Sequence, residues 1–440
     1  MKRVFTWGAV AALAAVGLFL LIRNSLAVTA LVALDPNEGW NAAHTLALLA
    51  GRPLYPPPAS LIVNNYPPLS FYLVAALTRL TGDAIIAGRL LSLLSFLAAC
   101  ALIAASARRM MCAPLGRLLA VTFFAGVLLI ASDYVGMDDP QLLGHALQLG
   151  ALLLLLREKT GAAALIFAAS LFIKHNLLAL PLACALWLWR RDRRQALRFM
   201  LAGGGSAVLG LILSRLIYGV NLLSVIASPR QLSLGNMVSA VHHLWWAVLP
   251  LFALLLLRRP KKDFLLIYAG TALACGLVFS AGDGVDANVF FDLAIACALG
   301  LSLSTAHGSL PAALSAVPLL GFLALNFQDN DFFFTRDFAT QSARDIAFLK
   351  SRPGPALCDQ LSLCLWAGKG AELDVFNVGE QIKTGTRDPA PLAGMIAAHR
   401  FAAIQLQDAD ALGPAARAAI GKNYHLDHSD DNGDFFTPSL

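Results

Sequence analysis

Long apolar stretches separated by short polar connections dominate this chain. A hydrocarbon core about 30 Å thick needs about 20 mostly apolar residues in a helix to cross it. Eleven stretches meet this requirement wholly or in part, at 4–22, 84–107, 117–131, 141–156, 161–173, 177–189, 197–217, 242–257, 263–280, 290–305 and 310–326. The pattern predicts an α-helical polytopic membrane protein with about eleven transmembrane helices.

Basic residues gather in every second connection between these stretches. The clusters lie at 2–3, 108–117, 157–159, 190–194 and 258–262. Because basic connections stay in the cytoplasm, the amino terminus is expected there, in a cytoplasmic (inner) membrane protein. An odd number of crossings then puts the segments 23–83, 218–241 and 282–289 outside, with the loop around Asp133 to Asp139 and the whole C-terminal tail.

Two neighbouring apolar stretches, 161–173 and 177–189, are too short to cross the membrane independently. The basic residues before the first of these stretches and after the second both belong on the cytoplasmic side. We therefore expect a short hairpin that carries Lys174 and His175 at its tip, below the outer membrane interface.

Beyond Asn326 the pattern changes to shorter polar and apolar stretches punctuated by Gly and Pro. It predicts a helix near 335–350, a strand near 356–359, and a helix and strand through 391–405. The chain is thus divided into a transmembrane domain, 1–326, and a small extracytoplasmic α/β domain, 327–440. An oxidising compartment would allow Cys358 and Cys364 to pair, which the sequence leaves open.

Composition excludes a water-soluble fold. Hydrophobic residues make up 58% of the 440 residues, charged residues 14%, and the mean hydropathy is +0.67, whereas soluble chains are about 25% charged. The net charge of +6 divides into 23 basic and 12 acidic residues before 327, and 10 basic and 15 acidic after it. The basic excess lies beside the apolar stretches, which suits anionic lipid headgroups and argues against nucleic-acid binding.

The first outer segment holds the most informative acidic residues. Asp35 ends an apolar run, where a carboxylate is costly unless it has water or a partner. Glu38 follows three residues later. Asp35 is therefore a candidate catalytic base, with an N-cap of the following helix as the alternative. Glu38 is either functional or a first-turn acid favoured by the helix dipole.

Other charged candidates lie at the outer ends of later stretches. Asp138 and Asp139 precede the stretch at 141–156, where they either act on substrate or cap a helix. Arg89 and Lys174 lie in or near apolar stretches, so each needs an anionic partner or a bound ligand. Asp286 and Asn288 lie in a Gly-containing loop at the mouth of the tenth stretch, where they either line a substrate cavity or cap a helix.

The order of these features resembles the GT-C superfamily, specifically the lipid-linked-sugar transferases related to protein mannosyltransferases and to the aminoarabinose transferase of lipid A. The resemblance is carried by Asp35, 51–55, 66–69, Gly82 and Arg89, and covers about residues 1 to 200. Relatives often carry an acid–Lys pair before the two prolines, where this chain has Asn-Tyr. Donor phosphate contacts must then come from elsewhere, or the donor differs.

The resemblance implies a GT-C fold and an inverting transfer of a sugar from a polyprenyl-phosphate donor to a glycan, lipid or protein acceptor at the outer membrane face. It gives Asp35 the role of base, and has Asp138 and Asp139 orient substrate or a metal. The expected substrate-binding residues are Glu38, Tyr66, Arg89, Lys174, His175, Asp286 and Asn288. Arg89, Lys174 and His175 would neutralise the phosphate.

Oxygen ligands from the two acidic loops suit Mg²⁺ or Mn²⁺, but relatives differ in metal dependence, so the cofactor stays open. Two alternatives to the enzyme also stay open. A lipid or glycan transporter would be expected to show an inverted repeat, which this sequence does not. A non-catalytic polyprenyl-lipid-binding subunit would tolerate the loss of Asp35. Which sugar, which acceptor and which oligomeric state apply is not written in the sequence.

Overall fold

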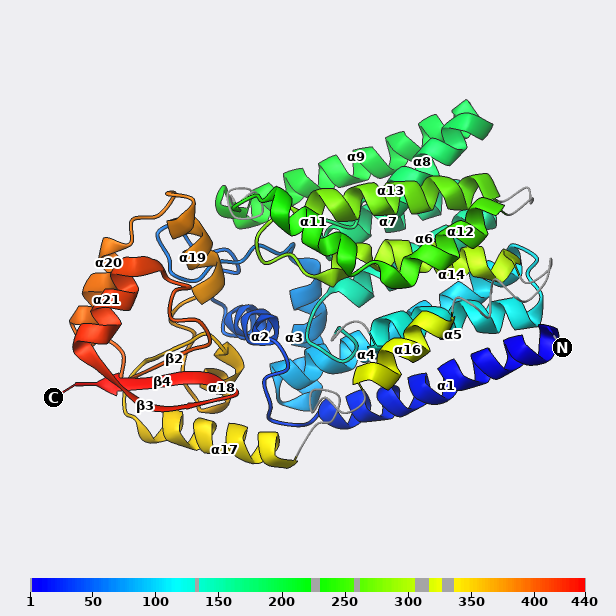
Figure 1. The fold of residues 1–440 in the computed structure, drawn as a ribbon. Helices are drawn as coiled ribbons and strands as arrows, with labels where there is room; N and C mark the ends of the chain where they lie inside the picture. The colour runs from blue at the N-terminus through cyan, green and yellow to red at the C-terminus, as the bar shows by residue number, and fades with distance from the viewer. Residues whose placement is uncertain are drawn as a thin grey trace.

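The computed structural model describes residues 2–130, 134–222, 230–256, 262–304, 316–326 and 336–439. A bundle of long helices forms one part of the molecule, and a smaller part with a four-stranded sheet lies beyond one end of that bundle (Figure 1). The amino terminus lies at the opposite end of the bundle from the sheet.

Every stretch that the sequence predicts to be apolar helix coincides with helix in the described residues. The bundle contains α1 (Lys2–Ala27), α4 (Ala84–Arg109), α5 (Pro114–Ile130), α6 (Gln141–Leu156), α7 (Thr160–Leu171), α8 (Ala179–Arg191), α9 (Arg193–Tyr218), α11 (Leu234–His242), η1 (Trp245–Ala247), α12 (Val248–Leu256), α13 (Lys262–Ser280), α14 (Phe291–Ser304) and α16 (Ala316–Asn326). Four of these helices are individually long and apolar enough to cross a membrane, or five with one bent pair. The protein is a multi-pass membrane protein, and the number of eleven crossings stays a prediction.

One predicted span differs in shape from the expectation. The stretch at 242–257 belongs to a bent pair, in which α11 and the helix from Trp245 to Leu256 meet at 52°. The helix before the bend was missed because Asn236, His242 and His243 interrupt the apolar pattern there.

Helix α14 forms the centre of the bundle. Every side chain from Leu293 to Leu299 is fully buried, and the helix packs against α5, α12 and α13. A helix that is apolar on all sides must be surrounded by other helices or by lipid. Because α14 is held on all sides, it also holds the loop that precedes it in place at one end of the bundle.

Two short helices, α7 and α8, occupy the two apolar stretches of the predicted hairpin. Helices α7 and α8 are joined by a turn at 172–178, and the Leu69 amide donates a hydrogen bond to the Phe172 carbonyl at 3.0 Å. Gln148 Nε2 donates to the Leu177 carbonyl at 2.6 Å. These contacts tie the hairpin tip to the first outer segment and to α6.

Two helices of the first outer segment, α2 (Pro36–Leu49) and α3 (Leu69–Thr81), lie between the bundle and the sheet domain (Figure 1). Asp35 caps α2, since its Oδ1 accepts a hydrogen bond from the Asn37 amide at 2.8 Å. Pro36 at the first helical position supports the same start.

The tail folds into a small α/β unit. Its elements are α17 (Arg336–Ser351), β1 (Ala356–Cys358), α18 (Leu361–Trp366), α19 (Val375–Lys383), α20 (Ala390–Ala397), β2 (Ala403–Leu406), α21 (Gly413–Asn423), β3 (Tyr424–Asp430) and β4 (Gly433–Pro438). The sheet order is β1-β2-β4-β3, with β1 and β2 parallel and the other pairs antiparallel. The predicted helix, strand, helix and strand are all present, and the β3–β4 hairpin was not predicted.

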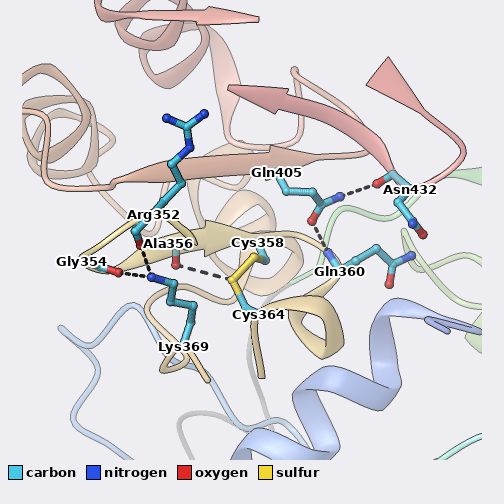
Figure 2. Close-up of a disulfide and its surroundings, with 9 residues drawn as sticks. All are labelled: Arg352, Gly354, Ala356, Cys358, Gln360, Cys364, Lys369, Gln405 and Asn432. Atoms are coloured by element: carbon cyan, nitrogen blue, oxygen red, sulfur yellow. Dashed lines mark hydrogen bonds between the residues drawn. A yellow bond between two sulfur atoms is a disulfide. The ribbon is translucent and has the colours of Figure 1, made fainter. Parts of the chain in front are cut away.

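Cys358 and Cys364 form a disulfide that links the end of β1 to α18 (Figure 2). Gln405 on β2 lies beside it and joins two other segments: its Oε1 accepts from the Gln360 amide at 2.8 Å, and its Nε2 donates to the Asn432 carbonyl at 2.6 Å. The pairing that the sequence left open is therefore found, inside a hydrogen-bonded core.

The tail domain packs closely on the segment 23–83, which joins α1 to α4. Gly39 of α2 lies against α18, so closely that a Cβ there would lie 2.4 Å from the Ser362 amide nitrogen. Arg387 Nη2 donates to the carbonyls of Pro58 and Ser60, both at 2.8 Å. The Asp374 amide donates to the Leu61 carbonyl at 2.9 Å. The tail thus packs on this segment at α2 and at residues 58–61.

Candidate functional site

A buried ion pair joins the first outer segment to the bundle. Arg89 Nε and Nη2 donate to the two carboxylate oxygens of Glu38, each at 2.6 Å, and both side chains are 0% exposed. The remaining Arg89 donors reach the carbonyls of Ala27, Ala30 and Val32 at 2.6 to 3.1 Å. Arg89 therefore has the anionic partner that its apolar surroundings require.

Glu38 is equally occupied. Besides Arg89, its carboxylate accepts from the amides of Leu34 and Asp138, each at 3.1 Å. The pair thus fixes the chain before α2 and the loop before α6 relative to α4. Neither side chain offers a free face to a ligand in this structure, which sets both apart from the substrate-contacting role expected of them from the sequence.

A second buried pair lies nearby. Lys174 Nζ contacts both oxygens of Asp139, at 2.9 and 3.0 Å, and Tyr66 Oη donates to Asp139 Oδ2 at 3.3 Å. The Lys174 ammonium also lies 4.9 Å from the centre of the Tyr66 ring. Three predicted site residues from three distant segments are thereby brought together, and Lys174 too has an anionic partner.

Asp35 is half-buried near this group and forms no ion pair within the described residues. Burial raises its pKa to about 6; the Asn37 hydrogen bond opposes this effect, and the nearby carboxylates of Asp139, Glu38 and Asp286 add to it. The two alternatives for Asp35 are thus not exclusive, because it caps α2 through one oxygen while its carboxyl titrates close to neutrality.

Asp138 precedes Asp139 in the loop before α6 and faces a small cavity. Within the described part of the chain, its Oδ2 has no hydrogen-bond partner, and neither have Thr45 Oγ1 and Ser70 Oγ, which line the same cavity. Burial raises the pKa of Asp138 well above its usual value, helped by Glu38 and Asp139. Gly88 is required here, since a Cβ would lie 1.8 Å from Asp138 Oδ1.

Of the other residues predicted to bind substrate, His175 and Asp286 are exposed and Asn288 is buried. His175 is exposed beside Lys174 at the hairpin tip, and Asp286 is exposed and caps η2 (Ala287–Phe290). Asn288 is buried, and its Nδ2 donates to Gln141 Oε1 at 3.3 Å. The structure thus places Asn288 in a side-chain pair that fixes the loop before α14, away from a direct ligand position.

Arg230 is a basic residue of this region that the sequence analysis missed. Its guanidinium lies 5.0 Å from the Phe376 ring centre, and its Nη1 donates to the Asp283 carbonyl at 3.0 Å. Its charge acts on Tyr66, His175 and Asp374, which places it at the site. A signal was present, because Arg230 is the lone Lys or Arg in the outer segment 218–241 and so departs from the positive-inside pattern.

Metal binding at this site finds no ready ligand set. Both Asp139 oxygens are held by Lys174. Among the described residues, one group of three His or carboxylate side chains lies close enough together to share an ion. This group lies in the tail domain, away from the site.

Comparison with known proteins finds similarity at the level of structure. No family model matches the chain, and no curated protein does. Two crystal structures of ArnT from Cupriavidus metallidurans, a GT-C aminoarabinose transferase, match it over 98% of both chains. The structure bound to undecaprenyl phosphate gives a TM-score of 0.63 at 14% identity, and the apo structure 0.62 at 12%. The chain therefore has a GT-C fold.

Proposed function

We propose that this GT-C chain is a polyprenyl-phosphate-dependent glycosyltransferase, acting at the outer face of the cytoplasmic membrane. The observation that carries the proposal is Asp35, a half-buried carboxyl with a pKa of about 6 and no cationic partner among the described residues. It lies beside the Asp139–Lys174–Tyr66 group in a fold whose solved example binds undecaprenyl phosphate.

Asp35 is the proposed base. Its carboxylate takes the proton from an acceptor hydroxyl, and the acceptor oxygen forms a bond to the anomeric carbon of the donor sugar. The bond from that carbon to the phosphate oxygen breaks, and the polyprenyl phosphate leaves with the electron pair. A single displacement of this kind inverts the anomeric configuration. A carboxyl with a pKa near 6 suits a base that works close to neutral pH.

Positive charge near the leaving phosphate comes from Lys174 and Arg230. Loss of solvent around the His175 ring, together with the charges of Lys174 and Arg230, lowers the pKa of His175 to about 4, so this residue offers a hydrogen bond and not a charge. Lys174 is held against Asp139, so it supplies a positioned but partly compensated charge. His175 is exposed and Arg230 is half-buried, which leaves both able to meet a ligand. Fixed cations stabilise a developing phosphate dianion most where water is scarce. Tyr66 and Asp286 border the same region.

Glu38 and Arg89 position these groups in our proposal. Their pair links the segment that carries Asp35 to the loop that carries Asp138 and Asp139. Asp138 and Asp139 retain their proposed part in orienting substrate, Asp139 through Lys174 and Tyr66.

Orientation is supported by two independent features. Basic clusters predict the amino terminus in the cytoplasm, and the Cys358–Cys364 disulfide fits an oxidising outer compartment. The site lies at the end of the bundle that the disulfide-containing domain covers (Figure 1). We infer that the sugar is transferred outside the membrane, with the lipid tail of the donor among the helices.

The test is sugar transfer from a panel of radiolabelled polyprenyl-phosphate sugars in membranes. Asp35→Asn is compared with the parent and with Asp192→Asn, at matched protein levels. Asp192 caps α9 at the other end of the bundle, so it controls for loss of a capping carboxylate. Asn is an equally good cap, so α2 should persist in Asp35→Asn.

We expect Asp35→Asn to reduce transfer by roughly 10²- to 10⁴-fold, and Asp192→Asn to leave it unchanged. Equal activity of Asp35→Asn and the parent would remove Asp35 from the chemistry. No transfer by the parent with any donor would overturn the proposal and favour a binding or transport protein.

A further inference from the structure

A second cluster of titratable side chains lies in the tail domain, away from the proposed catalytic site. Asp345 on α17 and His428 and Asp430 on β3 each offer a ligand atom, and these atoms all lie within 4.8 Å of one another. None of the three belongs to the site described above. Figure 1 shows α17 running beside the β3–β4 hairpin that carries the other two.

Asp345 is the buried member of this cluster. Its side chain is 2% exposed and lies 3.3 Å from His428 Nε2 through Oδ1. Its Oδ2 accepts from Asn432 Nδ2 at 2.6 Å. One carboxylate oxygen is thus held by a neutral amide, and the other faces the cluster.

Asp345 and Asp430 meet without a Lys or Arg between them in the described residues. The ligand atoms of Asp345, Asp430 and His428 all lie within 4.8 Å of one another. Two carboxylates in contact repel each other unless a proton or cation lies between them. Among the described residues, Asp345 is paired with His428, and no Lys or Arg pairs with Asp345 or Asp430. A shared cation resolves this repulsion.

His428 is oriented as a metal ligand would be. Its Nδ1 faces Asp427 Oδ2 at 3.0 Å, which leaves Nε2 directed at the cluster. Its ring stacks on Phe435 at 4.4 Å between centres, with 9° between planes. Metal-binding histidines commonly use their second nitrogen to contact a carboxylate, which fixes the tautomer and the ring orientation.

The backbone around the cluster is held in place from the other side. The β3–β4 pairing shifts register between Leu426 and His428, and His428 contacts Asp345 on α17. Asn432 is anchored through its carbonyl by Gln405, next to the disulfide (Figure 2). The backbone amide of Asn432 also donates a hydrogen bond to Asp430 Oδ1 at 2.9 Å. Asp345 and Asp430 are therefore both held by Asn432, which is itself fixed by Gln405.

We propose that Asp345, His428 and Asp430 bind a divalent transition-metal ion that fastens α17 to the β3–β4 hairpin. One imidazole and two carboxylates suit Zn²⁺ or Mn²⁺ better than Ca²⁺, which takes oxygen ligands. Three protein ligands leave room for water in the remaining positions. The proposal is independent of the proposed sugar transfer, because it uses no residue of that site.

Metal binding is measured on the full-length protein in detergent, after EDTA treatment and its removal. Zn²⁺ is titrated by calorimetry and Mn²⁺ by electron paramagnetic resonance, each alone. Asp430→Asn and His428→Ala remove single ligands. Asp431→Asn is the matched control, since Asp431 is the exposed neighbour of Asp430 and lies outside the cluster.

We expect one saturable site in the parent and in Asp431→Asn, with a rise in Tm on adding the bound metal. Asp430→Asn and His428→Ala should each bind at least about tenfold more weakly. Absence of saturable Zn²⁺ and Mn²⁺ binding in the parent would overturn the proposal. So would binding that both ligand variants retain in full.

Discussion

Asp35 gives the proposed reaction its pH dependence. A base with a pKa of about 6 is protonated in acid, so the transfer rate should rise with pH and level off above about pH 6. The measurement is the pH profile of kcat/KM in membranes. A rate that stays constant from pH 5 to 8 would contradict this assignment.

The same residue has a calculable effect on stability. Its folded pKa is raised above the unfolded value of 3.8, so the stabilisation from its protonated form is present below about pH 4 and is lost as the pH rises through 6. Asp35→Asn should therefore have a Tm at pH 7.5 at least equal to that of the parent. If Asp35→Asn is inactive but as stable as the parent, then Asp35 acts in the reaction and its loss does not impair folding.

Glu38 and Arg89 should matter most for stability. Glu38→Gln leaves the Arg89 guanidinium buried without a counter-charge, which costs about 3 to 5 kcal/mol for pairs of this kind. We expect a large drop in Tm in detergent. The exposed pair of Arg417 and Asp410, each side chain 62% exposed, is the control, and Arg417→Gln should leave Tm unchanged. A similar small change for both would show that the Glu38 pair is not needed.

Helices were predictable from the sequence where their pattern is long and apolar. The stretch predicted at 141–156 coincides with α6, and most others agree within a few residues. The β3–β4 hairpin escaped because in β3, residues 424–430, the apolar alternation stops after Tyr424 and Leu426, and the rest of the strand is polar. The Asn432-Gly433 pair at its turn was a signal for it.

Contact between α2 and α18 gives a prediction at the scale of an element. Gly39→Ala would place a Cβ 2.4 Å from the Ser362 amide nitrogen, in backbone that cannot rotate away. We expect a lower Tm and reduced transfer, because α2 carries Asp35 at its start. Gly394→Ala in α20 meets nothing within 4 Å and should be neutral or slightly stabilising. Unchanged stability of Gly39→Ala would mean that α2 and α18 separate easily.

At the scale of the whole molecule, the sequence could place candidate residues on one side of the membrane but could not pair them. Asp35, Asp139 and Lys174 were each identified from their positions beside apolar stretches. That Arg89 pairs with Glu38, and Lys174 with Asp139, depends on how helices distant in sequence pack together. Arg230 and the tail contacts depend on the same packing, which no local pattern records.

The orientation of the chain can be tested directly. Arg417 in the tail and Arg194 at the start of α9 are both exposed. In intact cells, a membrane-impermeant maleimide should label Arg417→Cys and spare Arg194→Cys, above the background of the parent's own cysteines. Labelling of both after the membrane is broken is the control. The reverse pattern in intact cells would invert the proposed topology.

The covering of the first outer segment by the tail orders the events of biosynthesis. Asp35 leaves the ribosome early, whereas Arg387 and Asp374, which hold residues 58–61 in place, are synthesised after the whole bundle. The proposed site is therefore complete only once the last part of the chain has been translocated and folded. A nascent chain halted within the bundle would carry Asp35, the proposed base, without the contacts that hold residues 58–61, so we expect it to be inactive in the proposed transfer.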